Sequence, residues 1–191
     1  MSYRVNDIFY SLQGEGHNTG RAAVFVRFSG CNLKCSFCDT DFLHYEELSA
    51  EEIISRAKAL CPSTDVLVVL TGGEPTLQVD VALIDSFHEA GFGEVAMESN
   101  GTHVPPSNLD WLTVSPKENV VVEECSELKV LFEEGKEVSD LGIAADYYYL
   151  QPCDVGDVVR NSAITQACIS FIEKHPKWQL SLQTHKLIGF K

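Results

Sequence analysis

Short apolar segments of strand length recur along the chain, and segments with the pattern of amphipathic helices separate them. Several of the apolar segments contain almost no polar residue, which is typical of parallel strands covered on both faces. The seven predicted strands are AAVFVRFS (22–29), VLVVLT (66–71), EVAMES (94–99), WLTVS (111–115), ELKVLF (127–132), YYYLQ (147–151) and WQLSLQ (178–183). Their alternation with helices predicts right-handed βαβ units and a mainly parallel sheet.

Three of the intervening segments predict helices. In SAEEIISRAKAL (49–60), Ser49 can cap the first turn and Glu52 completes a capping box. Segments 80–90 and 162–174 have similar patterns. The chain has 191 residues, whereas a closed barrel of eight βα units usually takes about 250. We therefore expect an α/β fold, an open partial (β/α) barrel of about six or seven mostly parallel strands, with residues 1–191 forming a single domain.

The charge of the chain limits its partners. It carries 28 Asp and Glu against 14 Lys and Arg, a formal net charge of −14. This charge disfavours general binding to nucleic-acid phosphates and to anionic membranes. The first residues lack the basic start and apolar core of a signal peptide, and no apolar run approaches the ~18 residues of a membrane span. We expect a cytoplasmic protein with no direct nucleic-acid or membrane partner.

Three cysteines lie close together in GCNLKCSFCDTDF (30–42), just after the first predicted strand. Parallel α/β folds build their sites in such loops. Structural zinc sites and ferredoxin clusters take four protein ligands, so Cys31, Cys35 and Cys38 leave one coordination position open. A zinc site completed by a distant ligand, such as His44 or Cys61, is the alternative. The remaining cysteines are scattered and are expected to be small buried residues: Cys61, Cys125, Cys153 and Cys168.

The C-x3-C-x2-C spacing, with Phe37 before the last cysteine, resembles the signature of the radical S-adenosylmethionine superfamily. The resemblance implies a 4Fe-4S cluster on Cys31, Cys35 and Cys38, with S-adenosylmethionine chelating the fourth iron. Together these cofactors supply a radical that removes hydrogen from carbon, and the protein supplies position and exclusion of water.

Three strand ends fit a pocket for S-adenosylmethionine once this resemblance is considered. TGGEP (71–75) is similar to the glycine-rich segment of the superfamily, which assigns Gly72, Gly73 and Glu74 to the amino group of the cofactor. ESNG (98–101) offers Glu98 and Asn100 to the ribose hydroxyls, and SPK (115–117) offers a hydroxyl and an ammonium to the methionyl carboxylate. Each segment alone is an ordinary turn or strand exit.

Four further stretches narrow the resemblance: YSLQGEG (10–16), CDTDF (38–42), YLQPCD (149–154) and LSLQTHK (180–186). With the cysteine triad, they resemble the 7-carboxy-7-deazaguanine synthase family across nearly the whole chain. The resemblance implies conversion of 6-carboxy-5,6,7,8-tetrahydropterin to 7-carboxy-7-deazaguanine with loss of ammonia, a carbon–nitrogen lyase reaction of queuosine and 7-deazapurine biosynthesis. S-Adenosylmethionine is a regenerated cofactor in it. A radical activase acting on a partner protein and a zinc-binding interaction module are the alternatives.

The resemblance also carries site residues to matching positions. It implies substrate binding by Leu12, Gln13, Gly14, Arg27 and Thr71. It implies S-adenosylmethionine binding by Phe37, Cys38, Asp39, Gly73, Ser115, Pro116, Lys117, Gln151, Pro152, Cys153 and Asp154. Thr40 matches a magnesium ligand, in keeping with the oxygen ligands that Mg2+ prefers.

Three polar residues are further candidates. Glu15 can accept hydrogen bonds from the amino and ring N–H groups of a pterin. Arg27 interrupts an apolar strand, where burial requires an anionic partner: the substrate, or one of the protein's own carboxylates. His185 is assigned to the substrate, with a structural role as the alternative. The last residues, LIGFK, depart from the proline ending common in the family, so Lys191 has no assigned role.

Two partners complete the expectations. The resemblance implies an external electron donor such as flavodoxin. The exposed flank of a partial barrel, together with the resemblance, favours a homodimer.

Overall fold

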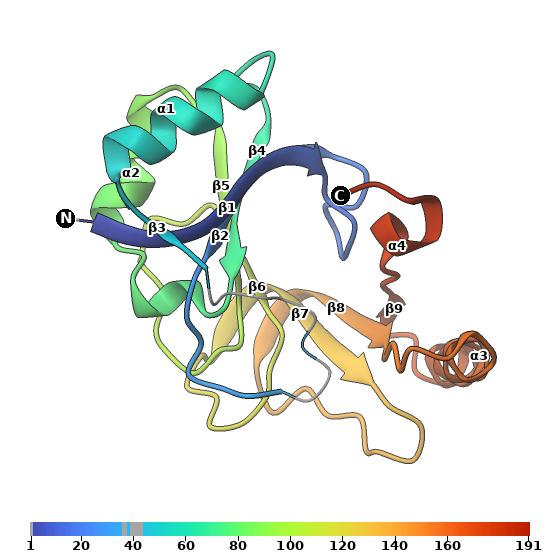
Figure 1. Ribbon diagram of the computed structural model, residues 1–191. Coiled ribbons are helices and arrows are strands. Elements are labelled where there is room, and N and C mark those ends of the chain that lie inside the picture. Colours follow the sequence, from blue (N-terminus) through green and yellow to red (C-terminus); the bar gives the residue numbers. More distant parts are fainter. Residues whose placement is uncertain (1, 36–37, 39–43) are drawn as a thin grey trace.

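The computed structural model describes residues 2–35, 38 and 44–191, so the predicted site residues Phe37, Asp39 and Thr40 lie outside the described residues (Figure 1). Nine strands form one sheet in the order β3-β1-β2-β4-β5-β6-β7-β8-β9. Their bounds are β1 Ser2–Leu12, β2 Ala22–Phe28, β3 Glu46–Ser49, β4 Leu67–Gly72, β5 Glu94–Ser99, β6 Trp111–Val114, β7 Glu124–Phe132, β8 Ala144–Pro152 and β9 Gln179–Leu180.

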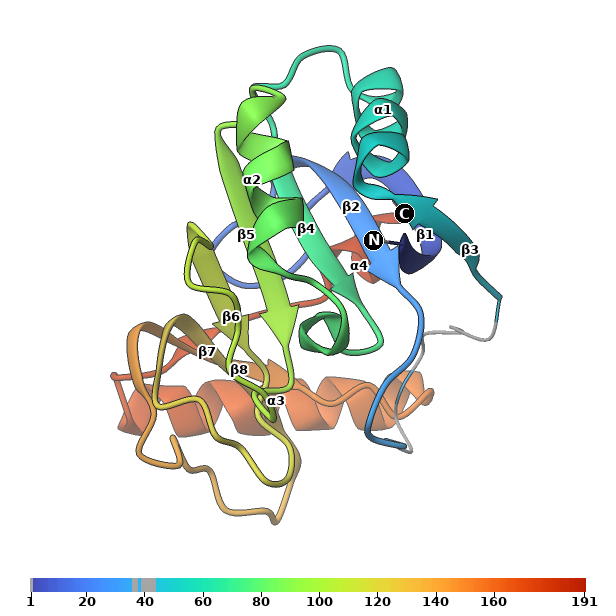
Figure 2. The ribbon, with the colours of Figure 1, turned by 90° about the vertical axis from the view of Figure 1, so that its left-hand side faces the viewer.

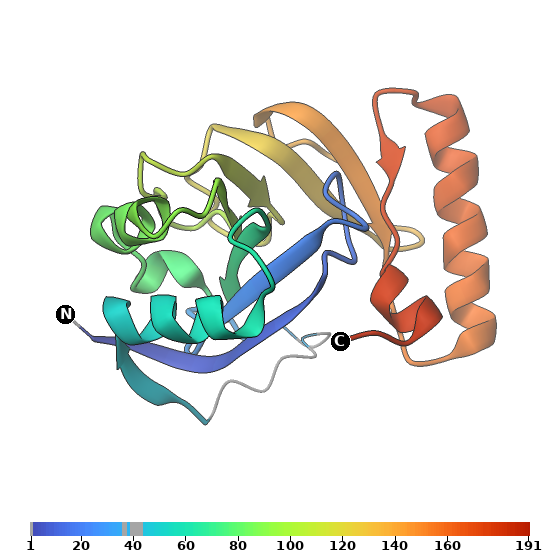
Figure 3. The same ribbon diagram turned by 90° about the horizontal axis from the view of Figure 1, so that it is seen from above.

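The seven predicted strands correspond to β2 and β4–β9, and every pairing among them is parallel. The sheet is strongly curved but stays open between its two ends, which confirms the partial barrel (Figure 3). The sequence prediction omitted β1 and β3, which pair antiparallel with their neighbours at one end of the sheet. β1 mixes polar and apolar residues, so a search for continuous apolar runs does not find it.

The helices α1, α2 and α3 lie on the outer face of the sheet, whereas the short α4 lies beside a cavity. Their bounds are α1 Ala50–Leu60, α2 Val81–Glu89, α3 Val158–Lys174 and the short α4 Thr184–Ile188, with a 3-10 helix at Pro75–Leu77. Ser49 and Glu52 form the predicted capping box of α1. α3 begins four residues earlier than predicted, because Asp157 caps it by accepting from the backbone N–H of Arg160. α1 and α2 pack beside β1–β5, and α3 packs outside β8 and β9 (Figures 1 and 2).

The two faces of the sheet carry different side chains because successive strand residues point to opposite sides. Residues such as Val24, Val26, Val68 and Leu70 pack in the main core beneath the helices. A smaller apolar cluster occupies the opposite, concave face: Phe9, Ala23, Phe25, Leu67, Val69 and Ala96. Within the described part of the chain, the helices are all too short or too polar to cross a membrane.

A bulge between Val5 and Asp7 shifts the register of β1 against β2. An extra residue in a strand reverses the facing of the side chains that follow it. Val5 therefore packs in the outer core, whereas Phe9 stacks on Phe25 in the concave face, with ring centroids 4.8 Å apart. The bulge thus lets β1 contribute to the outer core and to the inner wall.

Candidate active site

The concave face changes from apolar to polar along three neighbouring strands. On β2, Phe25 is followed two positions later by Arg27, and on β4 Val69 is followed by Thr71. On β5, Ala96 is followed by Glu98. The strands are parallel and Arg27 is paired in register with Thr71, so the polar positions meet at the same edge. This edge is the carboxyl end of the parallel strands, where α/β folds place their sites.

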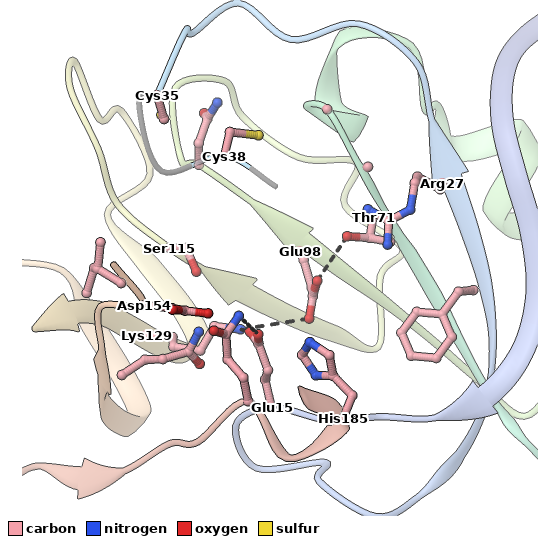
Figure 4. Close-up of a pocket in the computed structure, with 18 of the residues that line it drawn as sticks. Glu15, Arg27, Cys35, Cys38, Thr71, Glu98, Ser115, Lys129, Asp154 and His185 are labelled. Atoms are coloured by element: carbon pink, nitrogen blue, oxygen red, sulfur yellow. Dashed lines mark hydrogen bonds and ion pairs between the residues drawn. The ribbon is translucent and has the colours of Figure 1, made fainter. Parts of the chain in front are cut away.

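A cavity of about 750 Å3 opens at this edge. It is lined by nearly all of the predicted site residues that the structure describes (Figure 4): Leu12, Gln13, Gly14, Glu15, Arg27, Cys31, Cys35, Cys38, Thr71, Gly72, Gly73, Glu98, Asn100, Ser115, Lys117, Gln151, Pro152, Cys153, Asp154 and His185. Cys35 and Cys38 lie toward one end of the cavity, and Glu15, Glu98, Lys129 and His185 lie toward the other (Figure 4).

The cysteine end follows directly from β2. Cys31 and Cys35 are half-buried and Cys38 is exposed. Burial raises the pKa of the Cys31 thiol, and the charges of Glu74, Cys35 and Cys38 raise it further, against a backbone hydrogen bond from Leu33. These effects favour the protonated thiol. The positive charge of a bound iron–sulfur core would favour the thiolate and keep the three sulfurs deprotonated.

The donor set fits an iron–sulfur cluster. The sulfurs of Cys31, Cys35 and Cys38 share one cavity, which Cys153 also lines, and iron–sulfur clusters are held by cysteine thiolates. Among the described residues, no three Cys, His, Asp or Glu side chains already stand in a metal-binding arrangement. The fit therefore rests on the chemistry and common placement of the cysteines.

The glycine turn after β4 touches the cysteine loop. The backbone N–H of Gly73 donates to Phe28 O at 2.9 Å, and that of Glu74 donates to Gly30 O at 2.9 Å. A Cβ atom on Gly73 would lie 1.9 Å from Gly30 O, and Gly72 has a φ of 123°. Glycine is required here because the two backbones approach too closely for any side chain.

Glu74 departs from its predicted position. Its side chain is fully buried and is not among the described residues that line the cavity. The carboxylate accepts from the backbone N–H of Asn100 at 2.7 Å and from the hydroxyls of Ser99 at 2.9 Å and Thr76 at 2.6 Å. It therefore joins the glycine turn to the end of β5, and it contacts the cofactor pocket only through its neighbours.

Two other predicted cofactor residues are also placed differently. Asn100 lines the cavity, but its side chain donates to Asn32 at 3.0 Å and accepts from Thr102, so it anchors the start of the cysteine loop. Pro116 is absent from the lining among the described residues, whereas its neighbours Ser115 and Lys117 are present. Burial lowers the pKa of the Lys117 ammonium.

Glu98 belongs with the predicted substrate residues in this structure. Its Oε1 accepts from Gln13 Nε2 at 3.0 Å and its Oε2 accepts from Thr71 Oγ1 at 2.9 Å. Both contacts lie within the polar end of the cavity, away from the cysteines (Figure 4). The prediction that Glu98 binds the ribose came from its place at a strand end, which does not reveal the direction of the side chain.

Lys129 on β7 is a cavity residue that the sequence prediction missed. Its ammonium lies 2.5 Å from Glu15 Oε2 and 3.9 Å from Glu98 Oε1, with the side chain only 7% exposed. Burial alone lowers the pKa of Lys129, but the charges of Glu15, Glu98 and Glu127 outweigh burial and raise it above its ordinary value. Lys129 lies two residues after Glu127 on β7, so the two side chains point to the same face of the sheet. This spacing is the feature of the sequence that could have indicated Lys129 as a cavity residue.

Glu15 is held as an anion. Burial acts to raise its pKa, but the Lys129 charge, hydrogen bonds from Lys129 and Gln183, and the His185 charge bring it to about 2. Gln183 Nε2 donates to Glu15 Oε1 at 2.9 Å, so both carboxylate oxygens have partners. Gln183 is a second residue that the sequence prediction did not assign.

The segment before α4 closes one side of the cavity by packing on the loop after β1. The backbone N–H and hydroxyl of Thr184 donate to Gly14 O at 3.0 and 2.8 Å, and Ser181 Oγ accepts from Gly16 N–H at 3.0 Å. A Cβ atom on Gly14 would lie 2.4 Å from Nδ1 of His185. The stretches YSLQGEG and LSLQTHK, far apart in sequence, are therefore contacting halves of one wall.

The end of β8 supplies the neighbouring wall. Gln151 accepts from Ser181 Oγ at 2.9 Å. Asp154 accepts from the backbone of Gly156 and from the side chains of Lys186 and Asn161. These hydrogen bonds lower the pKa of Asp154 to about 2. Pro152 and Cys153 lie between these two residues and also line the cavity.

Two cations flank the stacked Phe9 and Phe25 rings. The Arg27 guanidinium carbon lies 5.9 Å from the Phe9 ring centroid, and Lys191 Nζ lies 4.4 Å from it. Lys191 also pairs with Asp7 at 2.6 Å. Lys191 also lines the cavity, although no role was predicted for it.

Comparisons with known proteins agree with this geometry. Residues 25–117 match the radical SAM superfamily. The chain is 48% identical over 194 residues to the 7-carboxy-7-deazaguanine synthase of Bacteroides thetaiotaomicron, with 100% of both chains covered. It is 42% identical over 212 residues to that of Caulobacter vibrioides, with 99% of each covered. The crystal structure of QueE from Escherichia coli matches with a TM-score of 0.78 at 28% identity, covering 97% of this chain and 95% of that one.

These matches confirm the fold class, the resemblance and the kind of enzyme predicted from the sequence. They also favour this family over the radical activase and the zinc-binding module, since the similarity covers the whole length of the chain. The enzyme uses a 4Fe-4S cluster and S-adenosylmethionine and acts on a small molecule. The chain belongs to the 7-carboxy-7-deazaguanine synthase family, radical S-adenosylmethionine enzymes that contract the ring of 6-carboxy-5,6,7,8-tetrahydropterin with loss of ammonia.

Proposed function

We propose that the two ends of the cavity divide the work of the reaction, with the cofactors at the cysteine end and the pterin at the end built from Gln13, Glu15, Arg27 and Glu98. The observation that supports this most strongly is that the cysteines and the buried polar set line one continuous cavity. The cluster and S-adenosylmethionine, when bound, supply the radical that removes hydrogen from the substrate carbon bearing the carboxylate.

On the cofactor side, Cys31, Cys35 and Cys38 hold the cluster. The glycine turn at Gly72 and Gly73 leaves backbone free to approach the amino group of S-adenosylmethionine. Lys117 and Ser115 receive its carboxylate, since both line the cavity and offer donors. The resemblance to the family assigns the remaining contacts of S-adenosylmethionine to Phe37, Asp39 and residues 151–154.

On the substrate side, hydrogen-bond acceptors face the pyrimidine ring of the pterin. Glu15 and Glu98 accept from its amino and ring N–H groups, with Gln13 and Thr71 fixing the orientation of Glu98. Leu12 and Gly14 form the adjoining wall and His185 borders Glu15. Because Glu98 sits among these residues, we assign it to the substrate and not to the ribose.

Arg27 has the substrate carboxylate as its proposed ligand. We expect Arg27→Gln to weaken substrate binding by about 10–100-fold, since a hydrogen bond to a charged group contributes about 1.5–3 kcal/mol. Calorimetry without reductant measures this affinity before turnover begins. Arg21→Gln is the matched control, because Arg21 makes a half-exposed ion pair with Glu94. An equal loss of substrate affinity in both variants would contradict the assignment of Arg27 to the substrate carboxylate.

Thr40 is proposed to bind Mg2+ together with the substrate carboxylate and waters. The ion orients the substrate and offsets its charge. We expect Thr40→Ala to raise the Mg2+ concentration needed for half-maximal rate by about tenfold or more, since loss of even an outer-shell partner of a metal ligand typically costs about 10–100-fold in affinity. Thr40→Ser, which keeps the hydroxyl, is the control. Loss of iron from Thr40→Ala, measured by metal analysis, would instead place Thr40 in the support of the cluster loop.

Several properties of the whole protein belong to the same proposal. We propose that residues 1–191 act as one domain and that the protein works in the cytoplasm, where thiols stay reduced. An external one-electron donor such as flavodoxin reduces the cluster. The outer strands β3 and β9 leave sheet edges for assembly, which supports a homodimer; light scattering during gel filtration tests this.

Incubation of the anaerobically reconstituted enzyme with 6-carboxy-5,6,7,8-tetrahydropterin, S-adenosylmethionine, Mg2+ and reductant tests the proposed function. The expected product is 7-carboxy-7-deazaguanine, identified by mass, with release of ammonia. Cleavage of S-adenosylmethionine without this product would contradict the substrate assignment. A colourless protein that holds zinc in place of iron would contradict the cofactor assignment.

A further inference from the structure

Three carboxylates gather near the ammonium of Lys129: Glu15 and Glu98 line the polar end of the cavity, and Glu127 is not among the lining residues that the structure describes. Glu15, Glu98 and Glu127 all lie close enough to raise the pKa of Lys129 through their charges. Like charges gathered in a region of low dielectric favour protonation of one of them. The protonation state of each carboxylate therefore decides which hydrogen-bonding pattern the cavity offers to a ligand.

Lys129 is placed to fix that state. It contacts Glu15 directly and lies within 4 Å of Glu98. Among the described residues, the hydrogen-bond donor to Glu127 is the backbone N–H of His17, which donates to Oε2 at 3.0 Å. The other oxygen of Glu127 is buried, and among the described residues it has no hydrogen-bond partner. Burial raises the pKa of Glu127. Of the three carboxyls, Glu127 therefore has the environment that most favours a proton, whereas Lys129 and Gln183 hold Glu15 as an anion.

An ionised Glu15 accepts hydrogen bonds and cannot donate them. The 2-amino-4-oxopyrimidine ring of a pterin presents an amino group and an adjacent N–H, which both donate. A ring with oxygen in place of the amino group presents an acceptor at that position. If the oxo group of such a ring lies against the Glu15 carboxylate, neither oxygen can donate a hydrogen bond to the other. In a site without water, these unsatisfied polar groups weaken binding.

We propose that Lys129 is a positioning residue that determines specificity: by holding Glu15, with Glu98 beside it, as an obligate acceptor, it selects 2-amino pterins and rejects their 2-oxo counterparts. This inference rests on the proposed binding of the pterin ring to Glu15 and Glu98. Lys129 acts through the carboxylates and has no assigned contact with the reacting carbon.

The test compares binding of 6-carboxy-5,6,7,8-tetrahydropterin and of its 2-oxo analogue to reconstituted enzyme with S-adenosylmethionine and Mg2+, by calorimetry without reductant. We expect the wild-type enzyme to prefer the amino compound by more than ~100-fold, as sites built around hydrogen bonds do. In Lys129→Met we expect this preference to fall by about tenfold or more, since a neutral Glu15 carboxyl can donate to the oxo group. Lys136→Met, which removes an exposed lysine on the loop after β7, is the control and should keep the full preference.

The pH profile separates positioning from a merely structural role. The groups that face Glu15 are Lys129 and Glu127 on β7, Glu98 on β5, Lys117 after β6, and His185 on α4. Without Lys129, burial leaves the pKa of Glu15 raised, so binding of the amino compound should weaken as pH falls through that raised value. We expect this weakening to begin at a higher pH in Lys129→Met than in the wild-type enzyme, where Lys129 and its neighbours hold the pKa of Glu15 at about 2.

Loss of the buried ammonium can also prevent folding, because breaking a buried ion pair costs about 3–5 kcal/mol. The double variant Glu15→Gln, Lys129→Gln then replaces it, since two amides can bond to each other without a net charge. It should likewise lose the preference for the amino compound. An unchanged preference in a folded variant would overturn the role of Lys129. A wild-type enzyme that binds neither compound and makes no product would overturn the proposed function itself.

Discussion

Replacing Cys35 with alanine should remove the iron from the protein and reduce product formation by far more than ~100-fold, the upper range for residues that only support a metal ligand. Cys35 is one of three thiols available to the cluster, and two sulfurs cannot hold it. Iron analysis and absorbance of the anaerobically reconstituted protein measure the loss. We expect the same result for Cys31→Ala and Cys38→Ala.

Cys61→Ala provides the matched control for this variant. Cys61 caps the end of α1, where its thiol donates to the backbone of Ala57, and it does not line the cavity among the described residues. The control should retain iron and activity. Full iron content in Cys35→Ala would mean that another residue completes the site, and the open iron position would then be filled by the protein.

Gly73→Ala should produce the second-largest effect. The new methyl group would lie 1.9 Å from Gly30 O and 3.1 Å from the backbone nitrogen of Cys31, so the cysteine loop must move. Overpacking of this kind costs about 1–3 kcal/mol of stability, and a misplacement of reacting groups by about 1 Å costs ~100-fold in rate. We expect lower iron occupancy and at least this loss of rate, measured at saturating substrate.

Gly93→Ala distinguishes this local clash from a general effect of replacing glycine. A Cβ atom at Gly93 meets nothing within 4 Å, and its backbone lies outside the left-handed region. The control should therefore match the wild-type enzyme in iron content and rate. If Gly73→Ala also matched it, the contact between the glycine turn and the cysteine loop would have no part in building the cofactor site.

Much of this architecture could be predicted from local sequence because the parallel strands are buried on both faces and read as continuous apolar runs. β1 could not be found in this way, since its register depends on a bulge at Val5 and Asp7 and on pairing with two neighbours. The start of α3 was also missed, because its Asp157 cap lies outside the apolar pattern that marked the helix.

The candidate active site was likewise predictable only in part. Motifs at strand ends, such as TGGEP and the cysteine triad, predicted residues that line the cavity, since parallel strands bring their carboxyl ends together. The roles of Glu74 and Glu98 required side-chain directions, which a turn sequence does not contain. Lys129 was missed because a lysine in a strand is usually exposed, and the alternation that places it on the same face of β7 as Glu127 was not used.

The reduced cluster examined by electron paramagnetic resonance, with and without S-adenosylmethionine, tests most directly whether three cysteines leave one iron open. Addition of the cofactor should change the spectrum of the wild-type enzyme, and 17O or 15N in its carboxylate or amine should show hyperfine coupling to the cluster. A spectrum that is indifferent to the cofactor, in enzyme that still forms product, would contradict an open iron in this site.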